Sequence, residues 1–145
     1  MKIIIDGDAC PSIPLIESKA KEFQVKVIIF CDIDHYITSD YSEVRVVDSG
    51  FQSVDMYIVN NLEKGDIVIT QDYGLASLVL SRNSYAINQS GMVYTNENID
   101  ELLYSRYISK KMRNSGARIK GPKKRDKSQD IIFKENLEKL ILNII

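Results

Sequence analysis

Five short apolar stretches in the first two thirds of the chain alternate with segments of helical periodicity. The apolar stretches are rich in Val and Ile, which is typical of strands buried on both faces. They predict strands at residues 2–5, 25–30, 43–47, 66–70 and 84–88. Helices are predicted between most of these strands, at residues 11–22, 52–62 and 74–82, with a polar loop at 31–42. This alternation indicates right-handed βαβ units, and hence an α/β fold: a three-layer α/β/α sandwich with a mainly parallel sheet.

The last third of the chain predicts one edge strand and two further helices. Residues 91–95 have the pattern of an edge strand, and a long helix is expected over 96–114 and to end at Gly116. The residues of that helix expected to face the core are Ile99, Leu102 and Leu103. A basic loop, 117–127, leads to a last helix with Ser128 as its predicted N-cap. The apolar stripe of this helix is predicted to be Ile132, Phe133, Leu137, Leu140, Ile141 and Ile144.

Length and composition favour one domain over the whole chain. The chain has 145 residues, 44% of them hydrophobic, so residues 1–145 are expected to form a single domain that includes the basic segment 106–127 and the final helix 128–145. No apolar run approaches the ~20 residues of a membrane helix, and nothing resembles a secretory signal. The two cysteines, Cys10 and Cys31, have neither disulfide-framework nor zinc-site spacing. We therefore expect a reduced, cytoplasmic protein with no membrane partner.

The net charge of −1 hides a division along the chain. Residues 1–100 hold 15 acidic and 7 basic side chains, whereas residues 101–145 hold 5 and 12. Most of the basic excess lies between Arg106 and Lys127, where the single acid is Asp126. An acidic region beside a basic strip suits a phosphate-rich partner.

Acidic side chains follow two of the predicted strands. Asp6 and Asp8 come at the end of the first strand, and Asp72 follows "DIVIT". Because the carboxyl ends of parallel strands form the ligand-binding crevice of such sheets, the three aspartates converge if the strands are neighbours. Clustered carboxylates repel one another unless a cation neutralises them, so a divalent-metal site is the first hypothesis. Asp8 and Asp72 have an alternative role, because aspartates at such turns often cap the following helix.

Asp55 adds a fourth acidic residue. On the helix 52–62 it shares a face with Phe51, Ile58 and Leu62, which predicts that it points toward the core. A buried carboxylate needs a partner, and a salt bridge or a loop cap would serve as well as a metal. Acidic oxygen ligands without converging His or Cys select Mg²⁺ or Mn²⁺ rather than zinc.

These residues resemble the YaiI/YqxD family of uncharacterised bacterial proteins, which looks like a branch of the PIN-like nuclease superfamily. The blocks that carry the resemblance are "DGDACP" (6–11), "GFQSVDMYI" (50–58), "GDIVITQDYGLA" (65–76), "GMVYTNENID" (91–100) and "GPKKRDKSQDIIF" (121–133). The resemblance implies a PIN-like fold and an acidic group that binds Mg²⁺ or Mn²⁺ for phosphodiester hydrolysis. The matching positions are Asp6, Asp8, Asp55 and Asp72. Thr70 fits the superfamily habit of a hydroxyl near the last of these.

One position departs from the family pattern. The family usually has arginine after the aspartate that precedes the last helix, whereas here Ile131 follows Asp130. Asp130 is therefore expected to favour the helix N-terminus, with the role of a fifth acid as the alternative.

The sequence thus predicts a metal-dependent nuclease that acts on RNA or single-stranded nucleic acid, with RNA favoured over DNA. Asp8 is the candidate to orient or deprotonate the attacking water. The residues predicted to hold the nucleic acid are Arg106, Lys110, Lys111, Arg113, Arg118, Lys120, Lys123, Lys124 and Arg125. Tyr104 and Tyr107 are available to stack on bases, but their helical spacing favours a place in or near the core.

Two other functions compete with this one. "IIIDGD" resembles the nucleophile motif of haloacid-dehalogenase-type phosphatases, although Cys10 replaces the usual Thr or Val and Asp55 would have no role. A non-catalytic nucleic-acid-binding module with a degenerate site is the other alternative. The oligomeric state is left open by the sequence.

Overall fold

The computed structural model describes residues 1–7, 10, 12–48, 50, 53–116 and 126–144. It contains a five-stranded sheet in which every pair of neighbouring strands is parallel. The order across the sheet is β3-β2-β1-β4-β5. The strands are β1 (Lys2–Asp6), β2 (Lys26–Asp32), β3 (Glu43–Val47), β4 (Ile67–Ile69) and β5 (Tyr85–Ile87).

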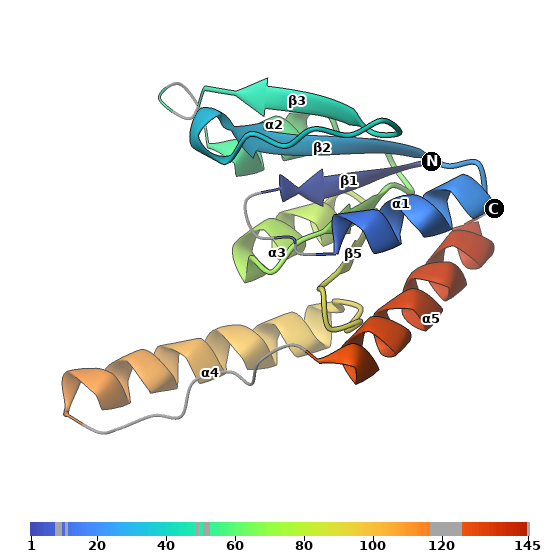
Figure 1. Cartoon of the computed structure of the whole chain (residues 1–145). Helices are drawn as coiled ribbons and strands as arrows, with labels where there is room; N and C mark the ends of the chain where they lie inside the picture. The colour runs from blue at the N-terminus through green and yellow to red at the C-terminus, as the bar shows by residue number, and fades with distance from the viewer. Residues whose placement is uncertain (8–9, 11, 49, 51–52, 117–125, 145) are drawn as a thin grey trace.

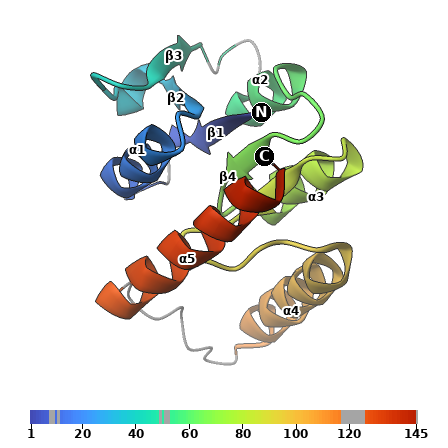
Figure 2. The same ribbon diagram turned by 90° about the vertical axis from the view of Figure 1, so that its right-hand side faces the viewer.

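Helices cover both faces of this sheet, so the predicted α/β/α sandwich is confirmed (Figures 1 and 2). On one face lie α1 (Ile13–Glu22) and α5 (Lys127–Ile144), and on the other lie α2 (Val54–Asn60), α3 (Tyr73–Ser81) and α4 (Asn96–Asn114). Alternate strand residues supply the two cores. Ile3 and Ile5 of β1 join the cluster under α1 and α5, whereas Ile4 joins the cluster under α2 and α3.

The strand order places the carboxyl ends of β1 and β4 side by side. These strands pair in register, with Ile5 opposite Ile69, and the chain leaves them toward opposite faces of the sheet. Where the connections after two neighbouring parallel strands run to opposite faces of the sheet, the loops leave a crevice between them that commonly binds ligands. The helices α1, α2 and α3 all begin at this edge (Figure 1).

The predicted edge strand at 91–95 is not a strand in the structure. This segment makes only an isolated antiparallel bridge between Ile87 and Val93. The reason is a tight turn, in which the side-chain oxygen of Asn88 accepts hydrogen bonds from the backbone N–H groups of Ser90 and Met92. Gly91 lies in this turn against α5, and its carbonyl accepts a 2.6 Å hydrogen bond from Asn136. The segment therefore anchors a helix instead of extending the sheet.

The start of α5 also differs from the prediction. Ser128 lies inside the helix, and the cap is Asp126, whose Oδ1 accepts hydrogen bonds from the backbone N–H groups of Ser128 and Gln129. The Ser128 hydroxyl donates to the same carboxylate and lowers the pKa of Asp126. Ile132, predicted for the apolar stripe, is 47% exposed, because the core contact of this helix is made by Phe133, Leu137, Leu140 and Ile141.

The helix α4 projects beyond the sheet edge at which β1 and β4 end (Figure 1). Its 19 residues span about 28 Å, and Ile99 is its one buried residue. Leu103, predicted to face the core, is 41% exposed, because only the first turns of α4 contact the sheet layer. Neither α4 nor any other helix among the described residues is long and apolar enough to cross a bilayer.

Candidate functional site

A single buried hydroxyl joins the acidic residues that end β1 and follow β4. Asp6 is the last residue of β1, and Thr70 directly follows β4. The Thr70 hydroxyl donates a 3.1 Å hydrogen bond to Asp6 Oδ2 and accepts a 3.0 Å hydrogen bond from the backbone N–H of Asp72. Thr70 is only 2% exposed. One hydroxyl therefore bonds both the carboxylate of Asp6 and the backbone N–H of Asp72, and the convergence of the two carboxylates on a ligand stays a prediction.

The backbone of Thr70 is held just as firmly. Its N–H donates to the carbonyl of Ile87, and its carbonyl accepts a 3.2 Å hydrogen bond from the Tyr94 hydroxyl. Burial of Tyr94 raises the pKa of its hydroxyl, so that this group stays a neutral donor at ordinary pH. Every polar group of Thr70 thus has a partner, and its hydroxyl cannot turn without breaking one of them.

Asp72 is the N-cap of α3. Its Oδ1 accepts hydrogen bonds from the backbone N–H groups of Gly74, at 2.9 Å, and Leu75, at 3.3 Å. The capping role that the sequence left open for Asp72 is therefore confirmed. Among the described residues, no group donates a hydrogen bond to the other carboxylate oxygen of Asp72. One oxygen holds the helix, and the second is available to a ligand.

Asp55 lies in the first turn of α2 and is half-buried. The N-cap of this helix is Ser53, whose hydroxyl accepts a hydrogen bond from the backbone N–H of Met56. Neighbouring Val54 and Ile58 are buried against the sheet, so Asp55 lies at the edge of the core. Phe51, with which it was expected to share a face, lies outside the described residues.

The predicted four-acid metal site is assembled only in part. In the described portion of the chain, no three side chains from His, Cys, Asp and Glu are grouped so as to hold a metal ion. Asp6 and Asp72 are linked through Thr70, Asp55 is not joined to them in such a group, and Asp8 lies outside the described residues. The complete ligand set stays a prediction.

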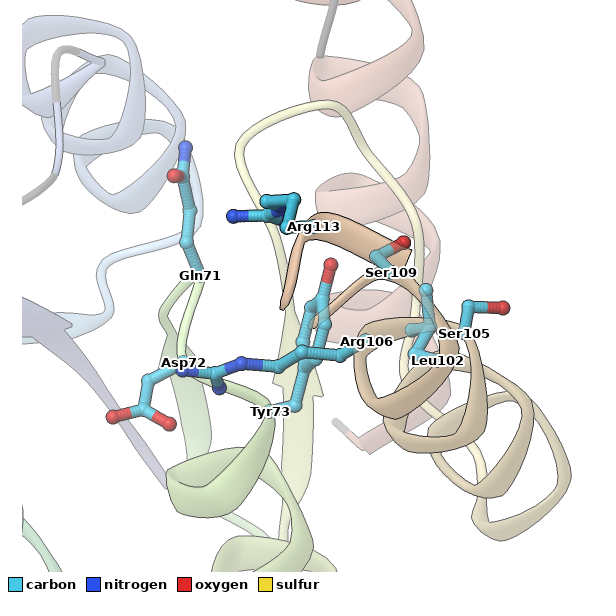
Figure 3. A pocket seen from close by; sticks show the side chains of 8 residues that line it. All are labelled: Gln71, Asp72, Tyr73, Leu102, Ser105, Arg106, Ser109 and Arg113. Atoms are coloured by element: carbon cyan, nitrogen blue, oxygen red, sulfur yellow. The ribbon is translucent and has the colours of Figure 1, made fainter. Parts of the chain in front are cut away.

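A cavity of about 600 Å³ opens beside this acidic pair, between the turn that joins β4 to α3 and one face of α4. Its lining residues are Gln71, Asp72, Tyr73, Leu102, Ser105, Arg106, Ser109 and Arg113. We call this cavity the α4 pocket. The side chains of Arg106 and Arg113 extend from α4 toward the turn, and the Asp72 carboxylate points away from Tyr73 and α4 (Figure 3). Asp72 therefore lines the cationic pocket while its carboxylate is directed away from the two arginines.

Only some residues of the predicted basic strip line the α4 pocket. Arg106 and Arg113 line the α4 pocket, whereas Lys110 and Lys111 are exposed on α4 outside it. The remaining predicted residues, Arg118, Lys120, Lys123, Lys124 and Arg125, lie outside the described residues. Asp130 is half-buried in the first turn of α5, where a negative charge favours the helix N-terminus.

The expectation that Tyr104 and Tyr107 lie in or near the core is wrong. Tyr104 is 66% exposed and Tyr107 is 62% exposed, because this part of α4 projects past the sheet. The aromatic residue in the pocket is Tyr73, which the sequence reasoning missed together with Gln71, Ser105 and Ser109. The helical spacing of the sequence could have found the two serines, because positions 102, 105, 106, 109 and 113 lie on one face of the helix.

Comparisons with known proteins agree on the family. The family model described as "Uncharacterized BCR, YaiI/YqxD family" matches residues 4–143. A "UPF0178 protein" of Clostridium kluyveri is 54% identical over 99% of this chain and 94% of its own length. A "UPF0178 protein" of Clostridium perfringens is 54% identical, over 97% of this chain and 95% of its own length.

Among solved structures, a mutant of Rae1 (YacP) from Bacillus subtilis is similar, with a TM-score of 0.43 and 16% identity over 99% of each chain. A likeness at this level carries no argument about activity. The match to the family model and the identity to its relatives extend over nearly the whole chain. The chain belongs to the uncharacterised bacterial YaiI/YqxD family.

Proposed function

We propose that this protein is a divalent-metal-dependent phosphodiesterase that cleaves RNA or another single-stranded nucleic acid. The observation that carries the proposal is the pair Asp6 and Asp72, held together by Thr70 at the carboxyl ends of adjacent strands. The α4 pocket supports it, because Arg106 and Arg113 line this pocket together with Asp72. Acids to hold a cation and arginines to hold phosphate are the two requirements of such chemistry.

The donor set fits a hard cation. Mg²⁺ typically binds proteins through one or two carboxylates and keeps several water molecules, which a site with Asp6 and Asp72 as its acidic residues would match. We assign Asp6 and Asp72 to hold Mg²⁺ or Mn²⁺, with Asp55 and Asp8 as further predicted ligands. A bound ion would supply an activated water and offset charge on the phosphate.

The other side chains of the site position the aspartates and bind the phosphate. Thr70 fixes the orientation of Asp6, since its single hydroxyl proton is directed at Oδ2. The capping bonds fix Asp72 in the same way. Arg106 and Arg113 attract and position the phosphate backbone, and guanidinium groups suit this task because they can bind phosphate in a bidentate manner.

The test is cleavage of labelled RNA, single-stranded DNA and duplex DNA with Mn²⁺, with Mg²⁺ and with EDTA. Asp6→Asn and Asp72→Asn keep the size of each side chain and one acceptor oxygen, and they remove its charge. Asp100→Asn is the matched control, because Asp100 is an exposed aspartate of α4 outside the pocket. We expect cleavage by wild type and by the control, and at least a hundredfold loss in the two site variants, of the order reported for lost transition-state charge stabilisation.

Three results would assign a different function. Cleavage unchanged in both site variants would remove the nuclease assignment. Formation of an aspartyl-phosphate on Asp6 would assign a haloacid-dehalogenase-type phosphatase. Nucleic-acid binding that survives both EDTA and Asp6→Asn, with no strand cleaved under any condition, would assign a non-catalytic binding module. The preference for RNA over DNA and the cytoplasmic location stay predictions.

A further inference from the structure

We propose that the α4 pocket binds one unpaired nucleotide, with its phosphate at Arg106 and Arg113 and its base against Tyr73. The inference rests on the proposed function in that the bound nucleotide belongs to the strand that passes Asp6 and Asp72. It adds a nucleotide-binding subsite to that function. Stacking of an unpaired base on Tyr73 would explain why single strands are preferred over duplexes.

The charge in the pocket suits a phosphate. Arg106 and Arg113 lie seven positions apart, which is about two helical turns, so both project from the same face of α4. Neither forms an ion pair with an acidic residue in the described part of the chain. The single acid in the lining, Asp72, directs its carboxylate away from the pocket and uses one oxygen to cap α3. The positive charge of the two arginines is therefore available to an anion.

The opposite wall suits a base. Tyr73 is half-buried, and its ring packs edge-on against Tyr94, with the ring centres 6.2 Å apart and the planes at 63°. This contact helps to hold the ring in place. On the same side of the pocket, the Gln71 amide donates a 2.7 Å hydrogen bond to Gln89, which holds the Gln71 side chain in place. An aromatic ring beside positive charge is the usual form of a base-stacking site for single strands.

The pocket has room for one nucleotide. About 600 Å³ lies within the range of small-molecule sites, so one nucleotide can enter. A paired base stays stacked inside a duplex and cannot reach a wall such as Tyr73 unless it is flipped out, which costs unstacking energy. The pocket should therefore take unpaired nucleotides.

The experiment measures binding in EDTA, where the proposed cleavage cannot occur. A fluorescein-labelled single-stranded RNA, the same sequence as a duplex, and adenosine monophosphate as competitor are the probes, with fluorescence anisotropy as the readout. Tyr73→Leu is expected to weaken single-strand binding roughly tenfold, which is the usual contribution of one stacked base, and to leave duplex binding unchanged. Tyr36→Leu, at an exposed tyrosine outside the pocket, is the matched control.

Salt dependence tests the arginines separately. Each neutralised phosphate adds about 0.7 to the slope of log affinity against log salt for a single strand, so the double variant Arg106→Ala/Arg113→Ala should lower the slope by about that amount. Arg82→Ala, at an exposed arginine that ends α3, should leave the slope unchanged. Adenosine monophosphate should compete with the strand, and adenosine without phosphate should compete less well.

Several outcomes would overturn the inference. If Tyr104→Leu and Lys111→Ala, on the opposite face of α4, weaken binding as much as Tyr73→Leu and Arg106→Ala do, the strand follows the outer face of the helix. If adenosine monophosphate binds through Tyr73 but the strand does not, the pocket is a free-nucleotide site. Binding that depends on Tyr73 and Arg106 without any cleavage would support the pocket and reject the nuclease proposal, so the two can fail independently.

Discussion

The hydroxyl of Thr70 donates to Asp6 Oδ2 over 3.1 Å while it accepts the backbone N–H of Asp72. The direction of both bonds is determined, because a backbone N–H can only donate and a hydroxyl has one proton. Asp6 therefore presents an acceptor oxygen to Thr70. Two acidic segments that lie 66 residues apart in the chain are connected by one buried oxygen atom, and four predictions follow from this arrangement and from the packing around it.

Removing the hydroxyl should destabilise the protein. Thr70→Val keeps the shape of the side chain but leaves Asp6 Oδ2 and the Asp72 N–H without this partner, so we expect a loss of about 1–3 kcal/mol in the free energy of unfolding. Thr70→Ser keeps the hydroxyl and should cost about 1 kcal/mol or less, for one lost methyl group. Urea denaturation measures both. A serine variant as unstable as the valine variant would show that methyl packing, and not the hydrogen bonds, matters at this position.

Asp72 should show separable structural and chemical roles. Asparagine is as good an N-cap as aspartate, so Asp72→Asn should retain nearly full stability, whereas Asp72→Ala should lose about 1 kcal/mol with the cap of α3. Both variants should lose cleavage, because both remove the carboxylate. Thermal or urea unfolding and a cleavage assay on the same preparations separate the roles. Full cleavage by Asp72→Asn would show that Asp72 acts only as a helix cap and has no role in cleavage.

Substitution of Gly91 and Gly116 by alanine should separate the cost of backbone strain from the cost of overpacking. Both have left-handed backbones, with φ of +91° and +88°. A Cβ at Gly91 would lie 2.8 Å from Ile132 Cγ2 and from the backbone nitrogen of Phe133, whereas a Cβ at Gly116 would meet nothing within 4 Å. Gly116→Ala should therefore cost about 1–2 kcal/mol from conformation alone, and Gly91→Ala about 1–3 kcal/mol more from overpacking.

Equal losses in the two glycine variants would contradict the close approach of the turn at Gly91 to α5. Urea unfolding gives the comparison directly. Near-ultraviolet circular dichroism adds a structural readout, because a displaced α5 would disturb the core around Phe133.

Stability should fall at alkaline pH partly through Tyr94. Burial raises the pKa of its hydroxyl above the ordinary value of 10.0, and the nearby Tyr73 and Asp72 add to the effect. As pH rises past 10.0, the unfolded chain loses this proton first, so the contribution is complete below that pH and is lost above it. Tyr94→Phe removes the titrating group, and its unfolding free energy should depend less steeply on pH above 10.0 than that of wild type.

Lys19 also contributes to the pH dependence of stability in this range. Its hydrogen bond to Glu138 raises the pKa of its ammonium group, so it also contributes stability that is lost at high pH. The difference between wild type and Tyr94→Phe isolates the tyrosine. Identical pH profiles for the two proteins would contradict the burial of an un-ionised Tyr94.

Local sequence determined the strands, the three-layer class and the placement of Asp6 and Asp72 at the carboxyl ends of neighbouring strands. Runs such as "KIIID" and "DIVIT" have one stable arrangement, because residues apolar on both faces must be covered on both faces. Parallel strands then bring their carboxyl ends to one edge, which is why acids that follow β1 and β4 could be predicted to converge. Thr70 was predicted beside them by family resemblance, and the structure shows the bonds it makes.

Tertiary structure alone decided which face of α4 is covered and what lies opposite it. Periodicity predicts that Leu103, Tyr104 and Tyr107 pack inward, but α4 projects past the sheet, and all three side chains are exposed among the described residues. The α4 pocket depends on the distance between α4 and the β4–α3 turn, which no local pattern encodes. The sequence by itself thus determined which residues are apolar enough to build the sheet and where its acids fall. Long-range packing decided that Tyr73, Arg106 and Arg113 line one cavity, because that depends on how far each helix extends beyond the core.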